Sequence, residues 1–528
     1  MSGVSVPQSS TGVRLAELIA SLSLATDLGL GLPEEHVLRQ TIIASRIARH
    51  AGLDESAQAS TFYVSLLAWV GCVADSHELA HWFGDDRQIR ADSYAVDKIG
   101  MPMMRMMLGH VGSGSSPLRR ITLFGQFLTG GFRDAVDGMV GHCQTTGDIA
   151  DRLGLDAEVR TSLAQAFERW DGKGIPGTAA GEQIETTMRV VQIADDAEVF
   201  HRAGGTSAVT ELLRSRRGTE FDPALVDVCL EHVDAVFADL DTVEAWNVVI
   251  DGCTPLDRAI PDSDLDVVLD AVADYADLKS PWYLGHSRAV AALVGDAATV
   301  AGCSASDVAT VARAARVHRL GATGVSTTIW NKPAWTAAER ERVRTVPYLT
   351  ERVLSRQSQL AAIGALAAMA HERMDGSGYP RGLAGSAIPD LARLLAAADT
   401  YQTLAEARPG RPALSDTDRE AALRADASQG RLDAGAVQAV LAAAGHRVRR
   451  RAPLVAGLTA REVEVLRLLV RGQSNKQIAA RLSITPRTVG THIEHIFAKA
   501  GVTTRGAAAM FALRHGLVDA QTSADHPM

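Results

Sequence analysis

The chain has 528 residues, of which 46% are apolar and 22% charged, so it can bury several hydrophobic cores and is not a disordered polypeptide. Its five cysteines are scattered with no Cys-x-x-Cys pair, which argues against a disulfide framework or a zinc ribbon and favours a reducing, cytoplasmic location. The N-terminus lacks a signal-peptide pattern, and the most apolar stretch, residues 60–74, is shorter than the roughly 18 to 20 residues that cross a bilayer. We therefore expect no membrane partner.

The net charge of −9 is unevenly distributed. Residues 454–518 contain nine arginines and lysines but only three glutamates, which makes this segment +6 and leaves −15 for the rest of the chain. A basic module behind an acidic body indicates that the module, and not the body, binds a polyanion.

A repeat occupies most of the first 445 residues. FERWDGKGIPGTAAGEQI (Phe167–Ile184) aligns without a gap with HERMDGSGYPRGLAGSAI (His371–Ile388), and Glu34–Leu53 aligns with Leu284–Cys303. The distance between the two aligned blocks is 46 residues longer in the first copy, which predicts an insertion between Trp69 and His142.

Both copies are rich in Ala, Leu and Val at helical spacing, so each predicts an α-helical bundle. We expect an all-α protein with two bundles and a C-terminal helix-turn-helix domain. The expected boundaries are 1–250 for the first bundle with its insertion, 251–448 for the second, 449–457 for a linker, 458–518 for the C-terminal domain and 519–528 for a tail.

The second copy contains, in order, DLKSPWYLGHSRAV, VHRLGATGV, NKPAWTAAE, HERMDGSGYPRGLAG and AAADTYQTL. Over about 165 residues these blocks resemble an HD-GYP domain, a helical member of the HD phosphohydrolases. The resemblance implies a hydrolase of cyclic di-GMP that works with two or three metal ions, such as iron or manganese. Such chemistry needs His and carboxylate ligands that hold the metals a few ångströms apart.

The second copy keeps only part of this ligand set. By the resemblance, His286, His318, His371 and Asp399 stand at ligand positions. The bridging aspartate is replaced by Arg319, and further positions read Trp282, Ala322, Val346 and Ala370. The first copy retains His36, His142 and Asp195 but has Ala68 and Trp69 in place of the HD pair.

These missing ligands argue against hydrolysis by the first 445 residues. Two non-catalytic interpretations of these residues are open. One is a ligand pocket for a cyclic dinucleotide or another small effector, formed by Arg373, Asp375, Gly376, Gly378, Tyr379 and Arg393. The other is a structural or dimerising bundle. A residual metal site at His286, His318, His371 and Asp399 also remains open, and with it a reduced phosphodiesterase.

Residues 458–518 predict three helices in a helix-turn-helix arrangement. Thr459 and Glu462 form a capping-box pattern, NKQIAARL a second helix, and Pro486 stands at the first position of a third helix, where its missing N–H costs nothing. A helix, a three-residue turn and a second helix place that second helix in the DNA major groove.

This segment closely resembles the LuxR/GerE-type DNA-binding domain along its full length. The resemblance implies that double-stranded DNA is a partner, that the chain acts as a homodimer, and that the last helix, about 504–513, is a common dimer contact. The residues it implies at the DNA are Lys476, Thr485, Arg487, Thr488, Thr491, His492 and Lys499. We therefore expect a cytoplasmic transcription regulator whose HD-GYP-like body senses an effector or dimerises; the alternative is a metal-dependent phosphohydrolase.

Overall fold

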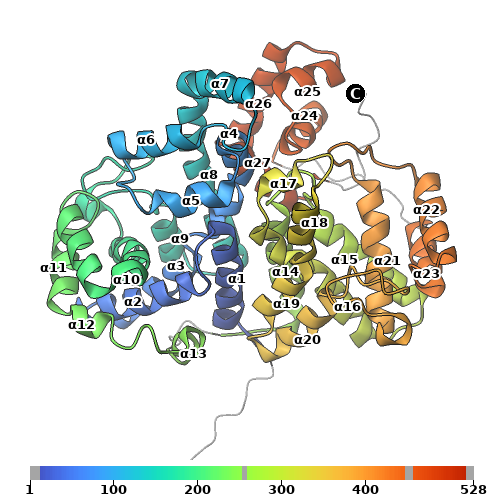
Figure 1. The fold of residues 1–528 in the computed structure, drawn as a ribbon, viewed down its shortest axis with the longest axis horizontal. Coiled ribbons are helices and arrows are strands. Elements are labelled where there is room, and N and C mark those ends of the chain that lie inside the picture. The colour runs from blue at the N-terminus through green and yellow to red at the C-terminus, as the bar shows by residue number, and fades with distance from the viewer. Residues whose placement is uncertain (1–11, 253–257, 446–455, 519–528) are drawn as a thin grey trace, which may run out of the picture.

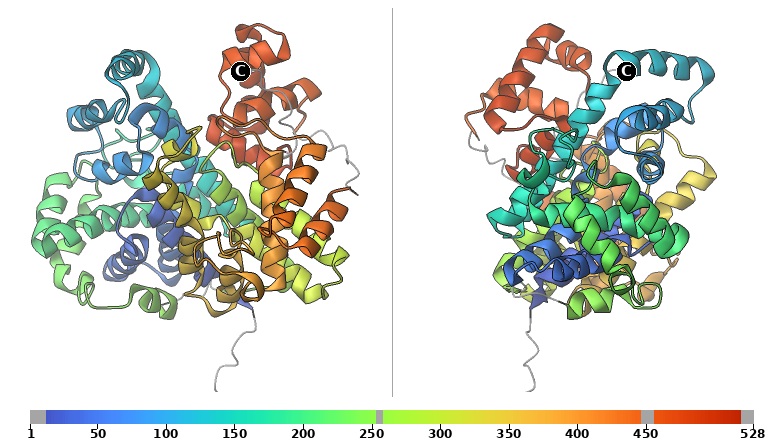
Figure 2. Two further views of the ribbon diagram at one scale, coloured as in Figure 1. Left: turned by 45° about the vertical axis from the view of Figure 1, so that its right-hand side comes forward. Right: turned by 90° about the vertical axis from the view of Figure 1, so that its left-hand side faces the viewer.

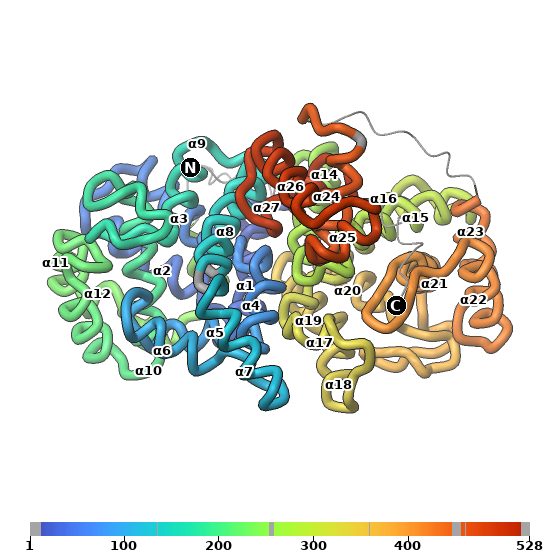
Figure 3. Tube along the Cα trace, turned by 90° about the horizontal axis from the view of Figure 1, so that it is seen from above, coloured from blue at the N-terminus to red at the C-terminus, as the bar shows by residue number. Residues whose placement is uncertain are grey.

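A computed structural model describes residues 12–252, 258–445 and 456–518. These residues form helices almost throughout, so the all-α prediction is confirmed (Figure 1). Most of the predicted linker, 449–457, and the whole tail, 519–528, lie outside the described residues. Two bundles stand side by side, and the C-terminal helices lie above the junction between them (Figures 1 and 3).

The first bundle contains the predicted insertion as a set of helices between η1 and the middle of α8. Its elements are β1 (Val13–Arg14), α1 (Leu15–Leu30), α2 (His36–His50), α3 (Glu55–Leu67), η1 (Val70–Val73), α4 (Ser76–Phe83), α5 (Asp86–Ser93), α6 (Gly100–His110), α7 (Pro117–Gln126), η2 (Phe127–Gly131), α8 (Phe132–Arg152), α9 (Ala157–Leu163), η3 (Gly181–Gln183), α10 (Thr186–Arg216), α11 (Pro223–Glu231), α12 (Val233–Val236) and α13 (Ala245–Asp251).

The second bundle repeats this order without the insertion. Its elements are β2 (Ala259–Ile260), α14 (Asp262–Asp277), α15 (His286–Val300), α16 (Ala305–Val317), η4 (Leu320–Gly324), α17 (Thr327–Trp330), α18 (Ala337–Arg344), α19 (Val346–Leu354), α20 (Ser358–Ala367), η5 (Gly385–Ala387), α21 (Asp390–Ala405), α22 (Asp416–Ser428) and α23 (Ala434–Gly445). Local chemistry is repeated as well: Asp27 at the end of α1 accepts the backbone N–H of Val37, and Asp277 at the end of α14 accepts that of Ser287.

The first helix of each bundle packs on its own bundle and also contacts the other. The strands β1 and β2 pair antiparallel, with Val13 opposite Ile260. From there α1 packs against η4 and α19 of the second bundle, while α14 packs against η1 and α8 of the first. The bundles are therefore joined by a shared core, as a single hydrophobic cluster running through both also indicates.

One segment, Glu55–Val73, is long and apolar enough to cross a membrane by length and composition. Within the structure, however, 78% of its most apolar window is buried. It forms α3 and η1 in the core of the first bundle, where an apolar sequence is what packing requires.

The C-terminal domain consists of α24 (Ala460–Val470), α25 (Asn475–Leu482), α26 (Pro486–Ala500) and α27 (Arg505–Arg514). The predicted capping box is present: the Thr459 hydroxyl accepts the N–H of Glu462, and the Glu462 carboxylate accepts the N–H of Thr459. Pro486 begins α26 as expected. The core side chains of Ile478, Val489 and Ile496 are fully buried.

The last helix packs on the body. Helix α27 lies against α8, and Figure 2 shows these helices side by side from two directions. Arg514 forms an ion pair of 2.9 Å with Asp148 of α8, and Arg288 of α15 donates a hydrogen bond of 2.8 Å to the Leu513 carbonyl. The fit is close, because a Cβ added at Gly141 of α8 would lie 2.1 Å from the Thr504 hydroxyl.

Candidate functional sites

Three histidines of the second bundle converge on Asp399. His286 begins α15, His318 follows α16, His371 precedes the Gly-rich loop, and Asp399 lies in α21. The distances to the Asp399 carboxylate are 3.1 Å from His286 Nε2, 3.3 Å from His318 Nε2 and 3.4 Å from His371 Nδ1. The structure thus brings together all four residues that the sequence predicted as metal ligands.

The surroundings fix how two of these rings are protonated. His286 Nδ1 is 2.9 Å from Glu406, and His318 Nδ1 donates to the carbonyl of Ala315 at 2.6 Å. In both rings Nε2 is therefore the nitrogen turned toward Asp399. Carboxylate or carbonyl groups behind a histidine are the usual supports of a metal ligand, because they fix the tautomer and the ring orientation.

The charges of the cluster are strongly perturbed. Burial opposes ionisation of His286, but Glu406 and Asp399 outweigh it and raise its pKa to about 9. Burial lowers the pKa of His318, and that of His371 to about 4. Burial disfavours charge on Asp399 as well, yet the neighbouring histidines hold its pKa well below the usual range. Asp399, His318 and His371 are thus in the protonation states in which they bind a metal, whereas His286 must lose a proton before it can do so.

The cluster suits one divalent metal ion. Nitrogen or oxygen atoms of His286, His318 and Asp399 all lie within 4.8 Å of one another, and buried His318 Nε2 has no hydrogen-bond partner. His371 would add a fourth ligand. A metal bound here would act as a Lewis acid toward a phosphate oxygen or a bound water. Among the described residues this is the only His/Cys/Asp/Glu group of this kind.

Arg319 stands where the family has its bridging carboxylate, and its side chain is held by neighbouring groups. The guanidinium lies over the Tyr283 ring, 3.3 Å from the ring centroid, and Nε lies 3.5 Å from Asp277. Arg408 stacks on the same tyrosine, also at 3.3 Å from the centroid. Cation–π contacts hold both guanidinium groups against the tyrosine ring. Arg319 supplies no carboxylate that could bind a second metal.

The Gly-rich loop is built in the same way in both bundles. Glu372 is buried and accepts the backbone N–H groups of Arg381 and Leu383, and Glu168 does the same for Gly177, Thr178 and Ala179. Gly378 allows close approach, since a Cβ there would lie 2.4 Å from the Arg373 nitrogen.

The residues predicted as a ligand pocket support this loop. Arg373 donates to the Glu372 carbonyl and to Thr400, and Arg393 donates to the Ile388 carbonyl. Tyr379 stacks on His371 with ring centroids 5.0 Å apart. Asp375 is exposed and accepts the backbone N–H of Ser377, and its neighbour Gly376 is half-buried. Their polar groups are thus largely used within the loop.

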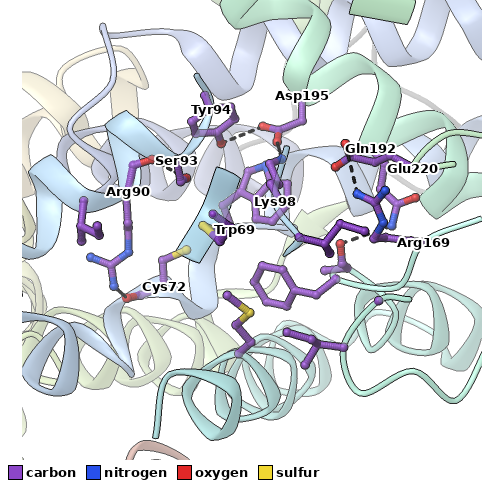
Figure 4. Close-up of a pocket in the computed structure, with 18 of the residues that line it drawn as sticks. Trp69, Cys72, Arg90, Ser93, Tyr94, Lys98, Arg169, Gln192, Asp195 and Glu220 are labelled. Carbon is purple, nitrogen blue, oxygen red and sulfur yellow. Dashed lines mark hydrogen bonds and ion pairs between the residues drawn. The ribbon is translucent and has the colours of Figure 1, made fainter. Parts of the chain in front are cut away.

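The first bundle has a lysine where the second has its histidine cluster. His36 lies 3.1 Å from Asp195 and 2.6 Å from Glu198, as His286 lies between Asp399 and Glu406. Here Lys98 Nζ lies 3.6 Å from Asp195 and 2.8 Å from Asp196, and the Tyr94 hydroxyl donates to Asp195 at 3.1 Å (Figure 4). An ammonium group thus takes the place of a metal ion beside Asp195.

The other histidine that the first bundle keeps at a ligand position, His142, also has a structural role. His142 donates from Nε2 to the Ala68 carbonyl at 2.7 Å and packs on Phe167. Lys98 and Tyr94 were missed by sequence reasoning because both lie in the insertion, which has no counterpart in the second copy. No sequence signal marks either residue, because the insertion contains many other charged side chains, such as Arg87, Arg90 and Arg105.

The third candidate site is the outer surface of the helix-turn-helix unit. The side chains of Lys476, Thr485, Arg487, Thr488 and Thr491 are exposed, and His492 is half-buried. Lys499 forms an ion pair of 2.7 Å with Glu462 and so stabilises the domain internally. The exposed residues lie on α25, at the turn and on the first half of α26, the part that enters the major groove in helix-turn-helix proteins.

Comparison with known proteins agrees with this division. Residues 270–435 match the model of the HD domain, and residues 456–512 match that of bacterial regulatory proteins of the LuxR family. The chain therefore combines an HD domain with a C-terminal LuxR-type DNA-binding domain, as the sequence predicted.

Individual relatives divide in the same way. The chain is 28% identical over 406 residues to 3'3'-cGAMP-specific phosphodiesterase 3 of Vibrio cholerae, covering 76% of this chain and 88% of that protein. It is 36% identical over 152 residues to the probable transcriptional regulatory protein NarL of Mycobacterium tuberculosis, covering 28% of this chain and 69% of the relative. A crystal structure of a V. cholerae cyclic GMP-AMP-specific phosphodiesterase, V-cGAP3, superposes with a TM-score of 0.57 at 24% identity, over 83% of this chain and 99% of that one.

Proposed function

We propose that the protein is a transcription regulator that binds DNA through α25 and α26 and carries a sensing module in its HD-GYP-like body. The observation that supports DNA binding most directly is the exposed row of Lys476, Arg487, Thr488 and Thr491 on an intact helix-turn-helix unit. Basic side chains there supply affinity for phosphates, and the threonines reach toward base edges.

The residues present at the two sites of the body support a regulatory role for it. The cluster around Asp399 can hold one metal, while the bridging position is Arg319 and the first bundle holds Lys98 instead of a metal. An in-line phosphodiesterase needs charge stabilisation on both the attacking and the leaving oxygen, which two metals normally provide. We infer that the second bundle binds iron or manganese and senses a cyclic dinucleotide, and that the regulator works as a homodimer in the cytoplasm.

The experiment is DNA binding across a salt series with the full chain and with a chain ending near Arg449. We expect salt-sensitive binding that truncation abolishes, and a shift in affinity with cyclic di-GMP or 3'3'-cGAMP. Absence of DNA binding by the full chain on a genomic fragment library would contradict the regulator, and an unchanged affinity with both nucleotides would contradict cyclic-dinucleotide sensing.

A phosphodiesterase is the second candidate, supported by the four-residue cluster and by similarity to proteins named as cyclic-dinucleotide phosphodiesterases. It predicts hydrolysis of a cyclic dinucleotide by iron- or manganese-loaded protein, abolished in Asp399→Asn. Turnover that survives this substitution would come from a contaminant and would remove the second candidate.

A further inference from the structure

A cavity of about 170 Å³ lies in the first bundle, between the insertion and the bundle core (Figure 4). Its wall is mainly apolar and includes Phe83, Ile89, Met103, Met107, Met139 and Phe167. Methionine side chains adapt to the shape of a bound molecule, so a Met-rich wall suits a small-molecule site. The cavity is close in size to an engineered apolar cavity of about 150 Å³ that binds benzene.

The charged groups at the cavity are largely neutralised by one another. Asp75 pairs with Arg90, and Asp195 is held by His36, Tyr94 and Lys98. Glu168 is used by the Gly-rich loop. A ligand carrying several charges would find no complementary set here, which excludes a dinucleotide on charge as well as on size.

Arg169 in the wall is also committed to protein contacts. It is 4% exposed, and its Nε and Nη1 atoms are engaged by Asp171, Asp97 and Glu220. Its Nη2 atom is buried as well, so the arginine offers no charged group to a molecule in the cavity.

We propose that this cavity binds a compact, uncharged, apolar molecule of about ten non-hydrogen atoms. The apolar wall supplies the affinity. The ligand site belongs to the first bundle, where Lys98 has replaced the metal, and is separate from the histidine cluster of the second.

The cavity is linked to the DNA-binding domain through α8, and this part of the inference rests on the proposed function. Met139 of α8 lines the cavity, and two and five residues further along this helix Gly141 and Gln144 contact Thr504 and Thr503. Asp75 lines both this cavity and the pocket between α8 and the C-terminal domain. A ligand that displaces Met139 would therefore change the surface on which α27 rests.

Fluorine NMR of the full chain, titrated with 4-fluorotoluene, tests the binding. We expect saturable binding of this apolar probe. Met103→Trp fills the cavity and should abolish binding, whereas Met101→Trp, on the same helix but 71% exposed, should leave it unchanged.

Two outcomes would overturn the proposal: no saturable binding of the probe, or binding that persists in a folded Met103→Trp variant. A separate measurement tests the link to DNA binding. If the probe binds while the DNA affinity of the full chain stays constant, the link through α8 is wrong. The proposed function fails only if the full chain binds no DNA.

Discussion

Lys98 Nζ lies 2.8 Å from the carboxylate of Asp196. This contact joins the insertion to the position in the first bundle that corresponds to the histidine cluster of the second. Asp196 also pairs with Arg216 at 2.7 Å, so the two adjacent aspartates share two cations. Ion pairs thus hold the insertion at the position that the histidine cluster occupies in the second bundle.

We expect Lys98→Met to destabilise the protein by about 2 kcal/mol, because it leaves two buried carboxylates with too little positive charge. The value is set below that of a fully buried pair because the lysine side chain is 27% exposed. Chemical denaturation measures the change. Lys332→Met breaks an exposed ion pair with Glu339 and should cost less than about 0.5 kcal/mol; an equal loss in both variants would contradict a special role for Lys98.

Metal content distinguishes the two bundles. Protein loaded with iron or manganese and then desalted should retain at most one equivalent, which Asp399→Asn removes. Asp195→Asn should leave the content unchanged, because Lys98 occupies the matching place. Elemental analysis gives the stoichiometry, and two equivalents lost together in the Asp399 variant would show a binuclear centre.

Arg487 is fully available on the surface of α26, and Arg487→Ala should weaken binding to all DNA sequences and lower the salt slope by about 1. Fluorescence anisotropy at several salt concentrations measures both quantities. Arg424→Ala, on an exposed face of the body, serves as the matched loss of charge and should change neither. A sequence-dependent loss for Arg487→Ala would instead assign this arginine to base readout.

Docking of α27 can be disrupted from the body without changing the DNA-binding domain. Gly141→Leu should force α27 away, since even a Cβ clashes with Thr504, while Gly147→Leu on the same helix has open space. We expect faster proteolysis between the body and the domain, and tighter DNA binding because the acidic body moves away from the phosphates. Identical cleavage rates for the two variants would show that the packing of α27 on α8 does not restrain the domain.

Glu462 gives the C-terminal domain a pH-dependent stability. Burial disfavours its ionised form, but hydrogen bonds from Lys499 and Thr459 outweigh burial and lower its pKa to about 2. A folded-state pKa below the unfolded value means that the contribution is present above about pH 4.5 and is lost as the pH falls toward 2. Glu462→Gln should therefore lower the melting temperature at pH 7, with a gap that narrows below pH 4.5. A gap independent of pH would assign the effect to the capping geometry alone.

The repeat and the C-terminal domain could be predicted because each is encoded by local pattern. The two loop sequences align without a gap, and the Glu372 and Glu168 carboxylates hold them in the same way. Likewise Thr459, Glu462 and Pro486 mark helix ends by rules that depend only on neighbouring residues.

Other features depend on contacts between distant segments and were not predictable. Nothing in the sequence places Lys98 beside Asp195, or stacks Arg319 and Arg408 on the two faces of Tyr283. The packing of α1 and α14 across the junction between the bundles also requires the three-dimensional structure.

The packing of the two bundles has a consequence for stoichiometry. Because β1 pairs with β2 and the first helix of each bundle also contacts the other bundle, the two repeats form a pair within one molecule. Within the described residues one helix-turn-helix unit follows the two bundles, so this pair presents a single DNA-binding surface. Occupying both halves of a palindromic operator therefore takes a second full chain, and hence four bundles, recruited through a surface other than the one that joins the repeats.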